Sequence, residues 1–256
     1  MELLAHARIV MWEGASLWVV DATPVTGPAP RRTDVHAHHA IQITISLGGA
    51  FALGAETARM AGEAVAVAAD APHEFEAEGL IAFLFVEPEG RLGRAISSRL
   101  FNNNELAPVP LALLGDFRER ATKSFRNARD DAAMIALGRA LAAQLAADVK
   151  ADAPDLRIRK MIAWAGQQLD GAPSLSDAAA AIGLSPGRLR HLFVEQTGLP
   201  FKTYLLWLRL TRALESFAGG APLTQAAHES GFADSAHLSR TFRRMFGVAP
   251  TALRMT

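Results

Sequence analysis

Cysteine is absent from the 256 residues of this chain, and long apolar runs are lacking too. Without cysteine there is no disulfide framework, no zinc site built on thiolates and no cysteine nucleophile. The most apolar window, residues 40–58, is interrupted by Gln42, Glu56 and three glycines, so no segment is expected to span a membrane. The first residues also lack the basic stretch that opens a secretory signal. We therefore expect a cytoplasmic protein.

Net charge is lacking as well, because 26 basic side chains balance 26 acidic ones. The balance hides an asymmetry: residues 1–154 hold 14 basic and 19 acidic side chains, whereas residues 155–256 hold 12 and 7. The first part therefore carries a formal charge of −5 and the second part +5. An acidic part joined to a basic part is common in proteins of which only the basic part binds DNA.

The first part of the chain, from Ile9 to about Glu87, consists of short apolar runs separated by turn residues. Four of these runs are expected strands, at residues 15–20, 41–47, 64–68 and 80–86. Within residues 41–47, apolar and polar side chains alternate with the period of two that a strand requires. Strands at this spacing are typical of an antiparallel sandwich or barrel. Residues 133–149 carry apolar side chains at helical spacing instead, which predicts an appended helix.

The chain beyond Asp155 is expected to be helical throughout. Six helices are predicted, at residues 157–169, 176–182, 186–197, 201–217, 224–230 and 235–246. Charge, alanine and proline in residues 149–155 indicate a linker. The predicted organisation is an α+β chain with a β-rich domain at residues 1–148, a linker at 149–155 and a helical domain at 156–256.

Two segments of the helical domain, residues 174–198 and 222–247, share one design. Each has a short helix, a glycine, an apolar residue, a capping Ser or Asp, and a longer helix that ends at glycine. Gly183 and Gly231 stand where the turn between the two helices needs a residue that tolerates positive φ. This pattern predicts a helix-turn-helix that is present twice, with a long central helix between the copies.

The longer helix of each copy has a polar stripe opposite its apolar side. The candidates for contact with DNA bases are Gly187, Arg190, His191, Ala236, Ser239 and Arg240. In the major groove, an arginine on such a stripe can bind guanine O6 and N7 through two hydrogen bonds. The candidates for contact with DNA phosphates are Arg188, Lys202, Arg209, Arg212, Arg243 and Arg244.

The segment GFADSAHLSRTFRRMFGVAPTALR, residues 231–254, resembles the C-terminal signature of the AraC/XylS family of bacterial transcription regulators. Residues 174–214 resemble the family's first helix-turn-helix and its central helix. The resemblance implies two recognition helices that enter successive major grooves, and a β-rich N-terminal domain for sensing and dimerisation. It places Arg190, His191, Ala236 and Arg240 at positions that contact bases. Gly187 and Ala236 offer no side-chain hydrogen bonds, so recognition at these two positions would be steric.

The β-rich domain contains DVHAHHAIQ, in which His36, His38 and Gln42 have even spacing, and a later turn that adds His73. This looks like a degenerate cupin pattern, and regulators of the resembled family commonly have a cupin-like sensor. A small effector is therefore expected in the mouth of the barrel, at His36, His38, Gln42, His73 and Phe75. The aromatic residues that either wall this pocket or belong to the core are Trp12, Trp18, Phe51, Phe75, Phe83 and Phe85.

The same histidines raise the question of a metal. Three imidazoles at His36, His38 and His73 are a suitable ligand set for a divalent transition metal. Gln42 stands where the cupin pattern has an acidic residue, and without that residue the negative charge that favours a cation is lost. Because the isoleucines opposite should be buried, the histidine side is also expected to face solvent. The sequence therefore favours a cupin-like fold without metal or other cofactor, with the metal site as the alternative.

Together these features predict a DNA-binding transcription regulator that is not an enzyme and that responds to a small effector through its β-rich domain. Its expected partners are double-stranded promoter DNA, the effector, RNA polymerase if it activates, and a second copy of the chain through the N-terminal domain. Effector binding would shift the population that is able to bind promoter DNA. The alternative is a metal-dependent cupin enzyme with the helical domain as an accessory.

Overall fold

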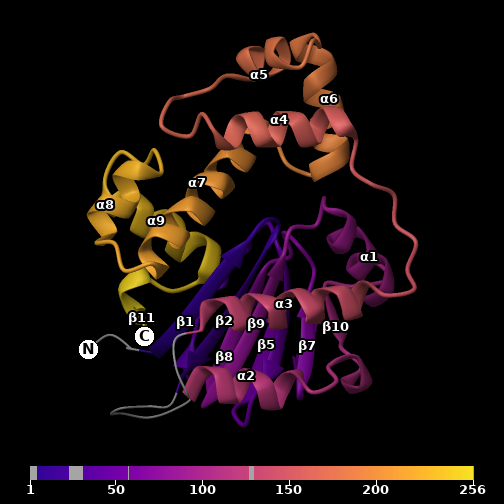
Figure 1. Cartoon of the computed structure of the whole chain (residues 1–256), viewed down its shortest axis with the longest axis vertical. Helices are drawn as coiled ribbons and strands as arrows, with labels where there is room; N and C mark the ends of the chain where they lie inside the picture. Colours follow the sequence, from indigo (N-terminus) through magenta and orange to yellow (C-terminus); the bar gives the residue numbers. More distant parts are fainter. Residues whose placement is uncertain (1–4, 23–30, 57, 127–129, 256) are drawn as a thin grey trace. The chain divides into compact units, whose positions relative to one another are not determined.

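The computed structural model describes residues 5–22, 31–56, 58–126 and 130–255. The chain divides into two compact units, and each is described by itself. The first comprises residues 1–88, 92–151 and 242–256, and the second residues 89–91 and 152–241. The fold is α+β, with a sheet-rich N-terminal part and a helical C-terminal part, which confirms the predicted fold class (Figure 1).

Two sheets form the centre of the first unit (Figure 1). The seven-stranded sheet has the order β10-β7-β4-β9-β2-β1-β11, with β1 at Ala5–Trp12, β2 at Ala15–Asp21, β4 at Ile41–Ser46, β7 at Ala64–Val67, β9 at Leu80–Val86, β10 at Leu106–Pro108 and β11 at Leu253–Met255. The four-stranded sheet has the order β3-β8-β5-β6, with β3 at Arg31–Arg32, β5 at Ala50–Ala55, β6 at Arg59–Ala61 and β8 at His73–Glu78. The strand pairs are antiparallel except for β1 and β11, which are parallel. The four strands predicted from the apolar runs are confirmed as β2, β4, β7 and β9.

Helices cover one face of the seven-stranded sheet. These are α1 (Arg91–Leu100), α2 (Phe117–Arg126) and α3 (Asp131–Ala146), and α3 contacts β1, β2 and β9 (Figure 1). Ile41, Ile43 and Ile45 on this face are fully buried and share a core with the apolar side of α3, as their alternation predicted. The helix predicted at residues 133–149 is therefore confirmed as α3.

The opposite face of β4 is buried too, which corrects the expectation that the histidine side faces solvent. Gln42 is 3% exposed and Thr44 is fully buried. The four-stranded sheet covers this face, since the ring of Phe75 in β8 lies 5.0 Å from the ring of Phe83 in β9. Both faces of β4 are thus buried: the isoleucines point into the core under the helices, and Gln42 and Thr44 point into the space between the two sheets.

The second unit contains helices at the predicted places. They are α4 (Leu156–Gly166), α5 (Leu175–Ala181), α6 (Pro186–Thr197), α7 (Phe201–Ala218), α8 (Leu223–Glu229) and α9 (Ser235–Phe246), of which α9 begins in this unit and ends in the first. Local signals set the ends of α6: Ser185 accepts a hydrogen bond from Arg188 N, and Gly198 ends the helix with a left-handed backbone. Within the described part of the chain, no helix has the length and apolar character to cross a membrane.

The last residues of the chain were predicted to belong entirely to the helical domain. In the structure, residues 242–256 are compact with the first unit, because β11 extends the seven-stranded sheet beside β1. The predicted boundary at residues 149–155 stays a prediction about which parts fold on their own.

Candidate nucleic-acid interface and ligand cavity

The turn between α5 and α6 and the turn between α8 and α9 have the same backbone hydrogen bonds. Leu184 N donates to Ala179 O at 2.9 Å in the first turn, and Phe232 N donates to Ala227 O at 3.0 Å in the second. The two alanines are buried inside the short helices of their copies. Two copies of one helix-turn-helix are therefore present, as the sequence predicted.

Both turns contain a glycine with a left-handed backbone. Gly183 has a φ of +70° and Gly231 a φ of +74°. Residues other than glycine rarely adopt this backbone conformation. At Gly231 the space is closed as well, because a Cβ atom would lie 2.1 Å from Leu169 O. The second turn therefore requires glycine both for its backbone angle and for its close contact with the chain after α4.

Helix α6 presents a cationic face. Gly187, Arg188, Arg190 and His191 are all exposed. On the other side of the helix, the apolar residues Leu189 and Phe193 are fully buried. The predicted base-contacting residues of the first copy are thus on the outside of the helix, where a groove of DNA can reach them.

Helix α9 has the same division. Ala236 and Arg240 are exposed, whereas Leu238 is buried. Ser239 is half-buried, and its hydroxyl donates a hydrogen bond to Ser235 O at 2.8 Å, which leaves the Oγ lone pairs for an outside donor. The second predicted stripe is therefore also on the outside of its helix.

The predicted phosphate contacts differ in how they are engaged. Arg188, Lys202 and Arg244 are exposed and form no ion pair with any described residue. Arg212 lies 3.4 Å from Asp170, and Arg243 Nε lies 2.8 Å from Asp34, in exposed ion pairs.

Arg209 has an internal role that the sequence did not predict. It is half-buried, and its guanidinium donates to the carbonyl oxygens of Leu169, at 3.3 Å, and Gly171, at 2.5 Å. These bonds tie the central helix α7 to the segment that follows α4. A contact between Arg209 and a DNA phosphate would have to break these two hydrogen bonds.

A cavity of about 170 Å³ lies in the first unit. Its aromatic walls are Trp18, Phe75, Phe83, Phe85 and Phe246, and its polar lining residues are Arg32, Thr33, His36 and Gln42. Of the predicted pocket residues, His36, Gln42 and Phe75 line the cavity, whereas His38 and His73 lie beside it in contact with His36. Two of the six aromatic residues proposed as walls are elsewhere: Trp12 packs on Gly138 of α3, and Phe51 does not line the cavity.

The sequence missed the part of the lining that comes from the end of the chain. Phe246, Val248, Ala252 and Leu253 contribute to the cavity. The ring of Phe246 lies 5.0 Å from Trp18 and 5.9 Å from Phe85. Only the apolar character of this segment hinted at burial, and no local pattern indicated which surface it covers.

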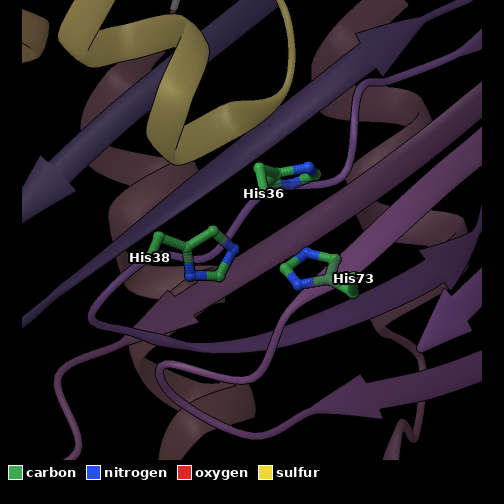
Figure 2. Close-up of side chains that lie close together, drawn as sticks. All are labelled: His36, His38 and His73. Carbon is green, nitrogen blue, oxygen red and sulfur yellow. The ribbon is translucent and has the colours of Figure 1, made fainter. Parts of the chain in front are cut away.

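His36, His38 and His73 form a buried cluster next to the cavity, as Figure 2 shows. His36 and His38 precede β4, and His73 begins β8, where the backbones of His36 and His73 form a bridge. Ring centroids are 4.2 Å apart for His36 and His73 and 5.0 Å apart for His38 and His73. The sequence therefore predicted correctly that the three residues come together.

The cluster favours uncharged imidazoles. Burial lowers the pKa of His36, and burial together with the neighbouring histidine His36 lowers the pKa of His38 to about 4. Burial, with the charges of His38 and His36, lowers the pKa of His73 to about 2. At neutral pH each ring therefore keeps one nitrogen with a free lone pair, which is the form that binds a metal.

A family model described as a helix-turn-helix domain matches residues 178–256. The chain is 38% identical over 108 residues to the uncharacterized HTH-type transcriptional regulator YidL of Escherichia coli strain K12. The aligned segment covers 42% of this chain and 36% of YidL. It is 36% identical over 101 residues to the HTH-type transcriptional activator RhaS of Escherichia fergusonii, and this segment covers 39% of this chain and 36% of RhaS. The match thus spans just over a third of the length of these curated relatives.

Solved structures of ToxT from Vibrio cholerae are similar over almost the whole chain. ToxT of strain O395 has a TM-score of 0.57 at 12% identity and covers 96% of this chain and 95% of ToxT. A ToxT structure with a bound unsaturated fatty acid has a TM-score of 0.54 at 12% identity, covering 98% of this chain and 95% of ToxT. At this identity the likeness shows a shared fold. Residues 178–256 thus match a helix-turn-helix domain, and the chain as a whole shares the fold of ToxT.

Proposed function

We propose that this chain is a sequence-specific DNA-binding transcription regulator whose first unit binds a small effector. The observation that carries the proposal is the repeated turn, with the same hydrogen bonds in both copies and a cationic stripe exposed on each following helix. A helix-turn-helix presents its second helix to the major groove, and two copies in one chain read two segments of DNA. The named relatives YidL and RhaS are a transcriptional regulator and a transcriptional activator.

The proposed base contacts are divided between the two recognition helices. Arg190 and Arg240 supply donors for guanine, and His191 and Ser239 supply further hydrogen-bonding groups. Ala236 has only a methyl group, which suits contact with the methyl group of thymine. Gly187 leaves open space, since no atom lies within 4 Å of the position that a Cβ would occupy. At Ala236 and Gly187, recognition depends on the shape of the base edge that each residue admits.

The proposed phosphate contacts are the exposed cations beside these stripes. Arg188, Lys202 and Arg244 are exposed, so a DNA phosphate can reach their charged groups directly. Arg212 and Arg243 would exchange an exposed carboxylate for a phosphate, at small cost because exposed ion pairs contribute at most about 1 kcal/mol. We leave Arg209 out of this set because its guanidinium is bound to two carbonyl oxygens.

The cavity in the first unit is the proposed effector site. Its aromatic walls and few polar groups have the composition of a small-molecule pocket. Its volume suits a small apolar compound with a polar end that reaches Thr33, His36 or Gln42. ToxT, a protein of the same fold, has been solved with a bound unsaturated fatty acid, so binding of a small apolar ligand is compatible with this fold. Pairing with a second copy and contact with RNA polymerase in the cytoplasm belong to the same proposal.

The comparisons do not favour the enzyme alternative, because the named relatives are transcription regulators. The test of the regulator is binding of the full chain to DNA from upstream of its own gene, measured by fluorescence anisotropy and footprinting against random competitor DNA. We expect a protected segment with two parts, and we expect the double variant Arg190→Ala/Arg240→Ala to lose the protection. Equal affinity for upstream and random DNA would contradict sequence-specific regulation.

A further inference from the structure

The three rings of the histidine cluster are oriented in the same way by the backbone. In each ring, Nδ1 lies within hydrogen-bonding distance of a carbonyl oxygen, in the pairs His36 with Asp34 at 2.8 Å, His38 with Ala40 at 3.1 Å and His73 with Ala71 at 2.9 Å. A carbonyl oxygen only accepts, so Nδ1 carries the proton and Nε2 carries the lone pair in all three rings. Histidines that bind metals are held in this way, with the other ring N–H donated to a carbonyl or a carboxylate.

One ring nitrogen from each of the three histidines lies in a small common volume. The ligand nitrogens of His36, His38 and His73 lie within 4.8 Å of one another, and Figure 2 shows the three rings side by side. Two nitrogens that bind the same tetrahedral ion at 2.0–2.1 Å are about 3.4 Å apart, so small ring rotations close the site. Nε2 of His73 is buried and has no hydrogen-bond partner among the described residues. An ion at this place would satisfy an atom that the protein alone leaves unsatisfied.

Gln42 supplies an oxygen at the same place. Its side-chain Nε2 donates to Thr44 Oγ1 at 2.9 Å, which turns Oε1 toward Nε2 of His38 at a distance of 3.1 Å. With the proton on Nδ1 of His38, this contact is favourable in two ways only: the Gln42 amide turns so that its N–H donates to the ring, or a cation lies between the two lone pairs. Two adjacent ligands of one metal ion have about this separation. A shared cation would therefore make the contact favourable with Oε1 facing the ring.

From these contacts we infer that His36, His38 and His73 bind one divalent transition-metal ion, with Oε1 of Gln42 as a fourth ligand. Three imidazole nitrogens suit Zn²⁺, Co²⁺ or Ni²⁺ better than Mg²⁺ or Ca²⁺, which prefer oxygen. The sequence favoured a fold without metal because Gln42 replaces a carboxylate and because the histidines were expected to face solvent. Their burial removes the second reason. This site concerns the first unit alone and does not depend on DNA binding.

The test is a titration of the full chain with Co²⁺ after treatment with a chelator, followed by visible d–d absorption and by calorimetry. We expect one equivalent of Co²⁺ to bind, with the absorption of a site of low coordination number, and Zn²⁺ to displace it. The variant His73→Phe keeps a buried ring of similar size and removes one ligand, so its affinity should fall at least tenfold.

The matched control is His39→Gln. His39 is as buried as His38, at 2% exposure, but its Nδ1 lies 2.8 Å from Asp70 Oδ2 and it is outside the cluster. This variant should bind Co²⁺ like the unchanged protein. If His73→Phe and His39→Gln weaken binding equally, or if the unchanged chain binds no Co²⁺, the proposed site is wrong.

A gain of affinity provides a second test that does not depend on the folding of a weakened variant. Gln42→Glu places a carboxylate where the amide oxygen lies, and a negative charge beside the ion should tighten Co²⁺ binding at least tenfold. The metal should also raise the melting temperature of Gln42→Glu more than that of the unchanged chain, because at a given metal concentration tighter binding stabilises the folded state more. An affinity unchanged by Gln42→Glu would exclude Gln42 as a ligand and overturn the four-ligand site.

Discussion

The ring of Phe246, the last residue of α9, lies 5.7 Å from the ring of His38. The helix that presents Arg240 therefore ends on the buried histidine cluster, and Phe246 also lines the cavity beside it. One lining residue of the cavity, Phe246, therefore belongs to the same helix as Arg240, a proposed base-reading side chain.

Gly247 provides a test of the packing at the end of α9. Its φ is +71°, and a Cβ at this position would lie 2.5 Å from both Asp34 O and His36 Nδ1. The matched control is Gly198, which ends α6 as Gly247 ends α9, has a φ of +78° and has open space around it. Both Gly→Ala changes strain the backbone, by about 1 kcal/mol. Only Gly247→Ala also forces the end of α9 away from the segment before β4.

We therefore expect Gly247→Ala to lower the free energy of unfolding by about 2 kcal/mol more than Gly198→Ala does. Urea unfolding measured by tryptophan fluorescence checks this, because Trp18 lies against Phe246. Equal losses for the two variants would mean that residues 242–256 do not pack on the first unit in solution.

The sequence could predict the elements whose signals are local. Ser185 and Gly198 marked the ends of α6, and the alternation along residues 41–46 indicated β4, because capping and burial of one strand face are decided within a few residues. The doubled helix-turn-helix was found for the same reason. Its evidence was a pattern of glycine, apolar and capping residues repeated in one stretch of the chain.

The rest depends on contacts between distant segments, for which the sequence holds no local signal. Nothing in residues 253–255 indicates that they pair with β1, and so the contribution of Phe246 to the cavity was missed. Trp12 was a candidate wall of the pocket, yet it packs on Gly138, because the pleat of β1 turns it to the face that α3 covers, and distant parts of the chain decide which face that is. The burial of the histidine side was missed because the four-stranded sheet that covers it comes from separate parts of the chain.

Asp155 at the start of α4 should make the free energy of unfolding depend on pH in the acid range. Its carboxylate accepts from Arg157 N at 2.8 Å and pairs with the Arg157 guanidinium at 2.6 Å. The side-chain hydrogen bond with Arg157, followed by the backbone one, lowers the pKa of Asp155 to about 2, below the value near 3.9 of an unfolded chain. The stabilisation is therefore complete above about pH 4 and is lost as the pH falls toward 2.

The variant Asp155→Ala removes this cap and should cost about 1 kcal/mol at pH 7. The difference in free energy of unfolding between the two proteins should shrink between pH 4 and pH 2. Asp170→Ala, which removes an exposed carboxylate from the same unit, serves as the control and should cost less at pH 7. A pH-independent difference for Asp155→Ala would show that the ionised carboxylate does not cap α4.

DNA binding by the proposed interface should depend steeply on salt. Each phosphate neutralised by the protein contributes a slope of about −0.9 to the plot of log affinity against log salt concentration. Replacing the exposed Arg188 by Ala should therefore make the slope less steep by about 0.9 on any DNA sequence. Arg120→Ala, an exposed change in α2 of the first unit, should leave the slope unchanged. A slope that responds equally to both variants would place the phosphate contacts outside the proposed surface.

Arg240 distinguishes base reading from charge alone. An arginine with two hydrogen bonds to one guanine contributes about 1–3 kcal/mol of discrimination, so Arg240→Ala should weaken binding to the specific site by about 5- to 150-fold. On random DNA the same variant should lose much less, because no particular guanine is in register. Arg244, four residues along the same helix and also exposed, provides the comparison. Arg244→Ala should weaken specific and random DNA by the same factor, as a phosphate contact does. If Arg240→Ala behaves like Arg244→Ala, then Arg240 contacts the backbone of DNA, and the second copy must read bases through Ala236 and Ser239.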